Sequence, residues 1–417
     1  MKKVYSFSNA RLLAFLTLLL FVFPSLVQAQ SKIQNPNIKL KFGKGLQVVA
    51  ADSSMALKIG FRFQSLYNSE RSLADDGEWA SNFLIRRSRL KFDGWAVNPN
   101  LVYKVELALS NRDLGSSSDF DQTSEAPKVV LDAVIKWKFH KNFTLWAGQT
   151  KLPGNRERVV SSQKLQFVDR SIVNGTFNID REMGLQLRGK FKSGNMVIKP
   201  MGSISFGEGR NTTISNIGGN HYVGRVELLP MGEFASKGDY FEGDLKREKA
   251  PKLAVGASYS YNNGAAKQKT TGKFLVDAEG NYFENNLETF IVDMMFKYNG
   301  LSILGEFADK RVVGIDGRDL GFRESLVDVN GRSYYTGQGI NTSIAYLFKN
   351  NLEIGTRYTQ IIPDTDVSFA GVKEYTLGMS KYIVGHNLKI QTDVSLIDKD
   401  GAAANKLRFR LQTEFAF

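Results

Sequence analysis

Several residue types that stabilise secreted proteins or serve enzymes are absent or scarce in this chain of 417 residues. There is no cysteine, so the protein has no disulfide and no thiolate for metal binding or catalysis. Histidine occurs only as His140, His221 and His386, without the spacing of a metal-binding motif. The nine prolines are scattered, and no Pro-rich or Ser-rich tract marks a linker. We therefore expect a single domain, no enzymatic activity and no cofactor.

Only one long apolar run is present, and it lies at the N-terminus. Three basic residues precede Leu12–Phe23, and the small residue Ala29 follows a few positions later. Because a membrane-spanning helix needs about 20 apolar residues, this run is too short to be one. The pattern predicts a signal peptide over residues 1–29 and a mature domain over residues 30–417.

The chain is basic, with 55 Lys and Arg against 42 Asp and Glu and a net charge of +13. Loss of the signal peptide would remove Lys2, Lys3 and Arg11 and leave +10. A basic surface attracts phosphate, nucleic acid, acidic polymers or anionic lipid. After export, nucleic acid is not an expected partner, which leaves small anions and the lipid of an outer membrane.

Alternation of apolar with polar or small residues recurs along almost the whole mature chain. It is clearest over residues 57–63, 101–109, 131–139, 253–261 and 388–396. This period of two is typical of β-strands with one apolar face. About sixteen strands are predicted, with centres near residues 61, 89, 105, 134, 146, 186, 199, 226, 257, 294, 304, 343, 356, 377, 392 and 411.

The connections between these strands alternate between short and long. Short turns such as residues 97–100, 140–142 and 298–300 contain Asn, Gly and Pro, whereas residues 110–128 or 151–179 form long connections. Outer-membrane barrels have this arrangement, with periplasmic turns at one rim and external loops at the other. Pro230–Pro251 breaks the rule, because it is long where a short turn is expected; it is interpreted as a periplasmic excursion.

An apolar face on sixteen strands requires an apolar environment. A barrel of this size is too wide to be filled by side chains, so its interior is wet and its apolar face points outward to lipid. The chain also ends in the alternating strand Leu407–Phe417, whose last residue is aromatic. We predict an all-β, antiparallel transmembrane barrel in the bacterial outer membrane; a soluble β protein is the alternative.

Basic residues are concentrated where such a barrel would have its channel. Arg87, Arg89 and Lys91 share one face of a strand, and each would cost about 2–4 kcal/mol in the middle of the lipid. They are therefore expected in the lumen, as a ladder with steps of about 6.6–7 Å that passes anions along. The alternative is a girdle of cations paired with acids elsewhere in the lumen.

The third long connection is the second concentration of charge. Its basic residues include Lys151, Arg156 and Arg158, and Arg181 and Arg188 follow on the next strand. A basic third loop folded into the channel would constrict it and select anions. The alternative is a solvated external loop.

Four segments give the chain a resemblance to the phosphate-selective porins O and P of Gram-negative outer membranes. They are Arg86–Leu90 with Gly94, Gly148–Pro153, Leu165–Ser171, and Arg181–Gly189. The resemblance implies a trimeric barrel of sixteen strands with an internal arginine ladder, a role that it assigns here to Arg86 and Arg87. Together with strand facing and loop charge, it gives nine candidate pore-lining, anion-binding residues: Arg86, Arg87, Arg89, Lys91, Lys151, Arg156, Arg158, Arg181 and Arg188.

The expected function is passive diffusion of small anions, phosphate or polyphosphate above all, through a homotrimer. Three alternatives remain open. The channel could be a general diffusion porin, or the barrel could be closed by its loops and serve for surface binding. A third alternative is an outer-membrane lipid hydrolase, for which His221 on the lipid-facing surface is the candidate.

Overall fold

The computed structural model describes most of the chain beyond its N-terminus. The predicted signal peptide, residues 1–29, lies outside the described residues, as do parts of the long connections. The described ranges are 37–74, 76–114, 128–213, 218–270, 272–313, 327–365 and 367–417.

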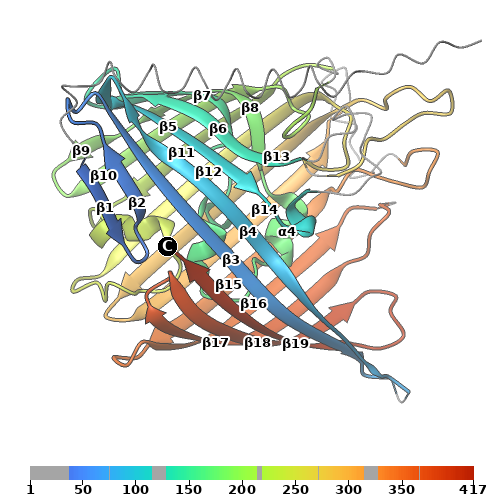
Figure 1. Ribbon diagram of the computed structural model, residues 1–417. Coiled ribbons are helices and arrows are strands. Elements are labelled where there is room, and N and C mark those ends of the chain that lie inside the picture. Colours follow the sequence, from blue (N-terminus) through green and yellow to red (C-terminus); the bar gives the residue numbers. More distant parts are fainter. Residues whose placement is uncertain are drawn as a thin grey trace, which may run out of the picture.

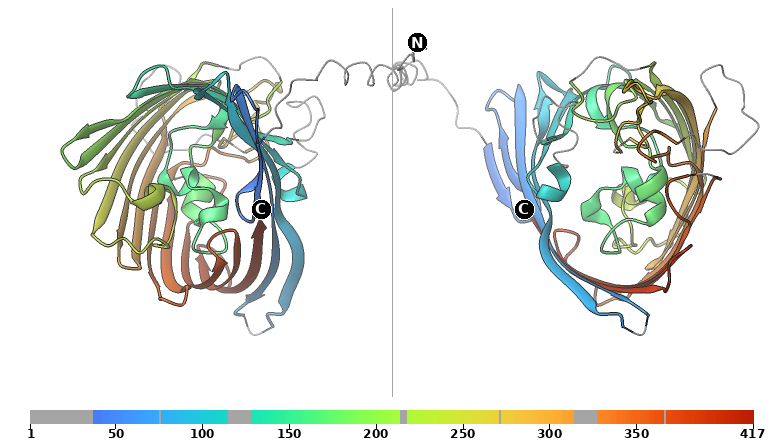
Figure 2. Two further views of the ribbon diagram at one scale, coloured as in Figure 1. Left: turned by 60° about the vertical axis from the view of Figure 1, so that its left-hand side comes forward. Right: turned by 90° about the vertical axis from the view of Figure 1, so that its right-hand side faces the viewer.

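Sixteen antiparallel strands form a closed barrel, because the last strand pairs with the first (Figures 1 and 2). The pairing Phe415↔Phe63 belongs to this seam. Closure leaves the barrel without free strand edges, as lipid requires. The strands are β3 (Met55–Ser72), β4 (Trp79–Ala96), β5 (Asn98–Ala108), β6 (Val130–Trp137), β7 (Phe143–Lys151), β8 (Arg181–Gly189) continued by β9 (Phe191–Ser193), β10 (Met196–Ser205), β11 (His221–Leu229), β12 (Lys252–Ala265), β13 (Asn285–Tyr298), β14 (Leu301–Val312), β15 (Gly337–Leu347), β16 (Leu352–Pro363), β17 (Val372–Val384), β18 (Leu388–Lys399) and β19 (Lys406–Ala416).

The predicted strand pattern is confirmed, since every predicted centre falls inside one of these strands. Strand β11 shows why alternation in the sequence locates the strands. Its residues alternate strictly between buried and exposed, with Arg225 and Glu227 facing inward and Tyr222 and Val226 facing outward. Side chains on a strand point to opposite faces in turn, so the apolar residues cover the outside of the barrel.

An N-terminal hairpin that was not predicted extends the sheet. It consists of β1 (Asn37–Lys41) and β2 (Gly45–Val49), and β2 pairs with the first residues of β3. At the seam, β19 pairs with β3 only as far as Arg62. The residues of β3 that precede Arg62 pair with β2 instead. The hairpin therefore lies at the same end of the barrel as Phe417.

The two ends of the barrel differ in their connections, as predicted. The short-turn end has connections of at most five residues between strands, except for residues 230–251, which include the 3₁₀ turn η3 (Ala235–Tyr240). The long-loop end has the longer connections, one of which contains α2 (Asn111–Leu114). No helix among the described residues is long and apolar enough to cross a membrane.

The third loop (residues 152–180) folds into the barrel interior (Figure 2). It contains α3 (Arg156–Val159), η2 (Ser162–Lys164) and α4 (Ile172–Phe177). Its apolar residues, such as Leu152 and Phe177, pack in one cluster with the inward-facing Val223 and Ile291 of the wall. The apolar residues of the loop therefore pack against this side of the barrel wall.

Two wall glycines make room for the aromatic rings of the third loop. A Cβ atom on Gly378 of β17 would lie 2.6 Å from the ring of Phe167, and one on Gly339 of β15 would lie 2.9 Å from the ring of Phe177. Both distances are well below van der Waals contact. Any larger residue at these two positions would push the loop away from the wall.

The substitution Gly378→Leu should loosen the third loop without opening the barrel. Overpacking costs about 1–3 kcal/mol, and the strand pairing does not depend on this contact. We expect trypsin to cleave the variant within residues 152–180, where the docked loop of the natural protein is protected. Gly224→Leu is the control, because Gly224 faces outward and its Cβ would meet open space. Equal protection in both variants, measured by mass spectrometry of the fragments, would contradict the packing.

Candidate functional site

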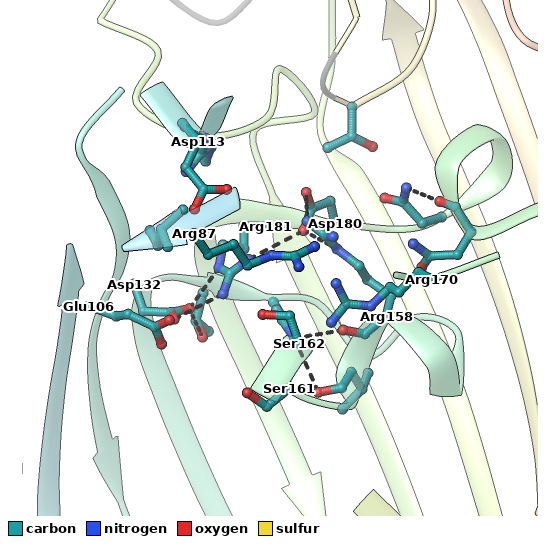
Figure 3. A pocket seen from close by; sticks show the side chains of 18 of the residues that line it. Arg87, Glu106, Asp113, Asp132, Arg158, Ser161, Ser162, Arg170, Asp180 and Arg181 are labelled. Carbon is teal, nitrogen blue, oxygen red and sulfur yellow. Dashed lines mark hydrogen bonds and ion pairs between the residues drawn. The ribbon is translucent and has the colours of Figure 1, made fainter. Parts of the chain in front are cut away.

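A cavity of about 640 Å³ lies between the third loop and the wall formed by β4 to β8. Among the described residues, fourteen Arg and Lys side chains line it against five Asp and Glu. Figure 3 shows Arg158 and Arg170 of the third loop on one side of this space and Arg87 of the wall on the other. The excess of positive charge makes the cavity a region that attracts anions.

A β-bulge brings two neighbouring arginines to the inner face of β4. Gln64 pairs with Arg87, but the next residue of β3 pairs with Ile85, so Arg86 is an extra residue in the ladder. Ile85 points outward and is 58 % exposed. Counted from the inward-facing Arg87, strict alternation would turn Arg86 outward and Ile85 inward. The bulge instead leaves Ile85 outside and allows both arginines to reach the same carboxylate of the third loop.

That carboxylate belongs to Asp169. Arg86 Nη2 lies 2.6 Å from Oδ2, and Arg87 Nη2 lies 2.8 Å from Oδ1. Burial alone would raise the pKa of Asp169, but the positive charges of Arg87 and Arg86 outweigh it and hold the pKa well below its usual range. Asp169 is therefore a permanent counter-ion that neutralises part of the basic wall.

Other wall cations are paired with acids of the same wall or of α2. Arg89 lies 3.1 Å from Glu106 and 3.0 Å from Asp113, and Arg181 lies 3.1 Å from Asp132. These pairs hold the guanidinium groups in fixed positions inside the barrel. This pairing matches the girdle that the sequence left as an alternative, and the passing of anions along a ladder stays a prediction.

Two cations of the cavity have backbone carbonyls as their main partners. Arg170 donates to the carbonyl oxygens of Glu157 at 2.8 Å and Val160 at 2.6 Å, and Lys151 Nζ donates to that of Arg158 at 2.6 Å. Among the described residues, no carboxylate lies within ion-pair distance of either cation. Burial, and then the charges of Arg158 and Arg87, lower the pKa of Arg170 well below its usual range. An anion in the cavity would relieve this repulsion.

Trp146 binds two further cations, of which sequence analysis predicted Arg188 as pore-lining but missed Lys136 and the ring itself. Lys136 Nζ lies 3.7 Å from the ring centre of Trp146, and the guanidinium carbon of Arg188 lies 4.0 Å from it. Cation–π contacts hold positive charge in place without neutralising it. Pairing in adjacent strands brings Lys136 beside Trp146, but the strand register is not visible in the sequence.

Seven of the nine predicted residues line the cavity, and their binding of anions stays a prediction. Lys91 lies outside the cavity lining and pairs with Asp93 at 2.7 Å. The predicted pore-lining position of Arg156 is corrected by the structure. Its side chain is 0 % exposed and donates to Asp293 at 2.8 Å, so it anchors the third loop to the wall instead of lining the pore. The seven are Arg86, Arg87, Arg89, Lys151, Arg158, Arg181 and Arg188.

The position of His221 does not fit the lipid hydrolase that sequence analysis left open. His221 faces the barrel interior and is 4 % exposed. Its ring nitrogens lie 3.0 Å from Glu182 and 2.6 Å from the hydroxyl oxygen of Ser260. The three side chains form a buried polar network between β8, β11 and β12, away from the lipid-facing surface.

A group of lysines lies closer to the short-turn end. Burial lowers the pKa of Lys164 in the third loop to about 8, with further contributions from the charges of Lys91 and Lys237. The positive charge of Lys58 also lowers the pKa of Lys164. These lysines extend the positive charge beyond the cavity.

A closed sixteen-stranded barrel with an apolar outer face and a polar interior narrowed by its third loop defines a porin of the outer membrane. The family profile of the phosphate-selective porins O and P matches residues 57–283, more than half of the chain. The protein belongs to this family. Its short-turn end is accordingly the periplasmic end.

Individual relatives are distant. An uncharacterized protein of Aquifex aeolicus is 23 % identical over 369 residues, which cover 82 % of each chain. The anion-selective porin from Comamonas acidovorans is 9 % identical over 87 % of this chain and 100 % of its own, with a TM-score of 0.53. The channel DcaP of Acinetobacter baumannii is 14 % identical over 88 % and 99 %, with a TM-score of 0.52. At these identities the two structures support the fold alone.

The substitution Asp169→Asn should increase the preference for anions. It removes the negative charge between Arg86 and Arg87 and keeps the size of the side chain. We expect the zero-current potential in a KCl gradient to shift toward chloride, most clearly at low ionic strength, where screening is weak. The control is Asp76→Asn, at an exposed position. A shift of the same size in the control would show that the effect does not come from the cavity.

Lys164 should make anion preference depend on pH. With a pKa of about 8, its ammonium group is charged at pH 7 and mostly neutral at pH 9, so the preference should fall as the pH rises between these values. Zero-current potentials of the natural protein and of Lys164→Gln test this. The fall should be smaller in the variant, and an equal fall in both would rule out a contribution from Lys164.

Proposed function

We propose that this porin is anion-selective and that its cavity binds phosphate or polyphosphate on the way through the outer membrane. The observation that carries the proposal is the unmatched positive charge of Arg170 and Lys151, whose described partners are carbonyl oxygens. A phosphate could accept hydrogen bonds from the guanidinium fork of Arg170 and from Lys151 at once. The hydroxyls of Ser161 and Ser162 also line the cavity.

Transport needs an anion site that binds and also releases. Asp169 competes with any bound anion for Arg86 and Arg87, which limits the affinity on the wall side. Lys136 and Arg188 offer a second positive site at Trp146, about 17 Å along β7 from Lys151 at about 3.3 Å per residue. Two sites of moderate affinity support passage from one to the other.

Three finer expectations from the sequence are part of this proposal. Export would use the signal peptide over residues 1–29, with cleavage before Gln30. The family resemblance supports a homotrimer in the membrane. The exposed apolar residues on the outer face of the strands would contact outer-membrane lipid and neighbouring copies.

Block of the chloride current by phosphate tests the proposed site at Arg170. Arg170→Gln removes one charged hydrogen-bonding partner of the anion, worth about 1.5–3 kcal/mol, and should weaken the block by phosphate roughly 10- to 150-fold. Arg170→Lys keeps the charge but not the planar fork, so we expect a block between the two. Arg112→Gln is the matched control, because Arg112 lines the outer part of the same cavity on α2.

The block is measured as the fall in single-channel chloride current with added phosphate in a planar bilayer. The result that would refute a phosphate site at Arg170 is an equally strong block in the natural protein and in Arg170→Gln. A natural protein with no preference between chloride and potassium would refute anion selectivity itself.

A further inference from the structure

The connection between β11 and β12 is unusually long for a connection at the periplasmic end. It takes 22 residues, whereas the other periplasmic connections between barrel strands need at most five. Neighbouring antiparallel strands can be joined by two residues. Connections of this length in a compact fold usually have a function of their own. Residues 231–250 are called the floor segment below.

The floor segment turns back into the periplasmic end of the barrel instead of extending away from it. Gly238, Asp239, Glu242 and Asp244 are buried. The turn η3 lies near the end of the barrel at which the C-terminus is labelled (Figure 1). A simple exposed excursion, as interpreted from the sequence, would not bury three acidic residues.

Its contacts with the barrel extend from β10 to the turn between β17 and β18, where the ring centre of Phe241 lies 5.8 Å from that of His386. Asp239 lies 2.5 Å from Lys199 of β10, and Lys297 of β13 donates to the carbonyl oxygens of Gly238 and Phe241 at 2.8 Å. Arg247 donates to the carbonyl oxygen of Leu347 at the end of β15, at 2.5 Å. The segment therefore covers the periplasmic mouth beneath this half of the wall.

The floor segment also holds the third loop. The amide of Glu242 donates to the carbonyl oxygen of Lys164 at 2.9 Å, and the carboxylate of Glu242 accepts from the amide of Gln166 at 2.9 Å. Lys164 Nζ lies 3.4 Å from the ring centre of Phe241. Arg156 donates to the carbonyl oxygen of Asp239 at 3.0 Å while it pairs with Asp293 of β13. The loop is thus fixed between the wall and the floor.

We infer that the floor segment determines the selectivity of the pore. It closes the periplasmic mouth beneath β10 to β17 and fixes the third loop from below. Ions must then leave on the opposite side, along the wall that carries Arg87, Lys91 and Lys58. Without the floor, a second exit would open past the less basic half of the barrel. This role rests on the anion selectivity of the proposed function, but not on which anion the cavity prefers.

The double substitution Phe241→Ala with Glu242→Ala tests the inference in the full-length protein. It removes the ring beneath Lys164 and the carboxylate that binds the Gln166 amide. Single-channel conductance should rise about twofold as the second exit opens, and the zero-current potential in a KCl gradient should move toward zero. Trypsin should also begin to cleave at Lys164. Lys246→Ala with Lys249→Ala is the matched control, because both lysines are exposed in the same segment.

The single variant Phe241→Ala is used if the double variant does not fold. It should shift the conductance, the zero-current potential and the cleavage at Lys164 in the same directions by smaller amounts. Folding is checked by the migration of unheated samples in gel electrophoresis. A folded variant with the conductance, potential and cleavage of the control would overturn the inference. Higher conductance with unchanged anion preference would also overturn it, since the floor would then limit size and not charge.

Discussion

The docking of the third loop on one half of the barrel wall is the constraint on which the rest of the structure depends. Arg156 anchors the loop to Asp293, and two wall glycines leave room for the rings of Phe167 and Phe177. Because this docking extends over β11 to β18 and reaches β3, the cavity that remains lies along β4 to β8. Those strands carry most of the arginines and lysines that line the cavity, so under the proposed function the loop directs permeating ions to the basic wall.

Charge inside the barrel follows from the cost of burying ions. A buried cation needs a counter-ion or good hydrogen bonds, and most wall arginines have a carboxylate from the wall or from Asp169. The cavity nevertheless has an excess of positive side chains. Arg170 and Lys151 are held by carbonyl oxygens, and Lys136 and Arg188 by the ring of Trp146. The fold thus keeps positive charge available where full pairing would have neutralised it.

The sequence predicted the barrel well and its interior less well. Alternation locates a strand because the side-chain period of two is local, and loop length separates the two ends of the barrel. The bulge at Arg86 depends on pairing with β3, so alternation alone cannot show it. The anchoring of Arg156 depends on Asp293, 137 residues away. The hairpin of β1 and β2 was missed, and the long connection after β11 was noticed but its inward fold was not foreseen.

The central claim is that permeating ions pass along a wall with excess positive charge. Its most direct test is the zero-current potential of the purified natural protein in a planar bilayer with a KCl gradient. The account predicts a potential with the sign set by chloride, and a larger preference at lower ionic strength, because the cavity charges are then less screened. A potential near zero, or one with the sign set by potassium, would contradict it.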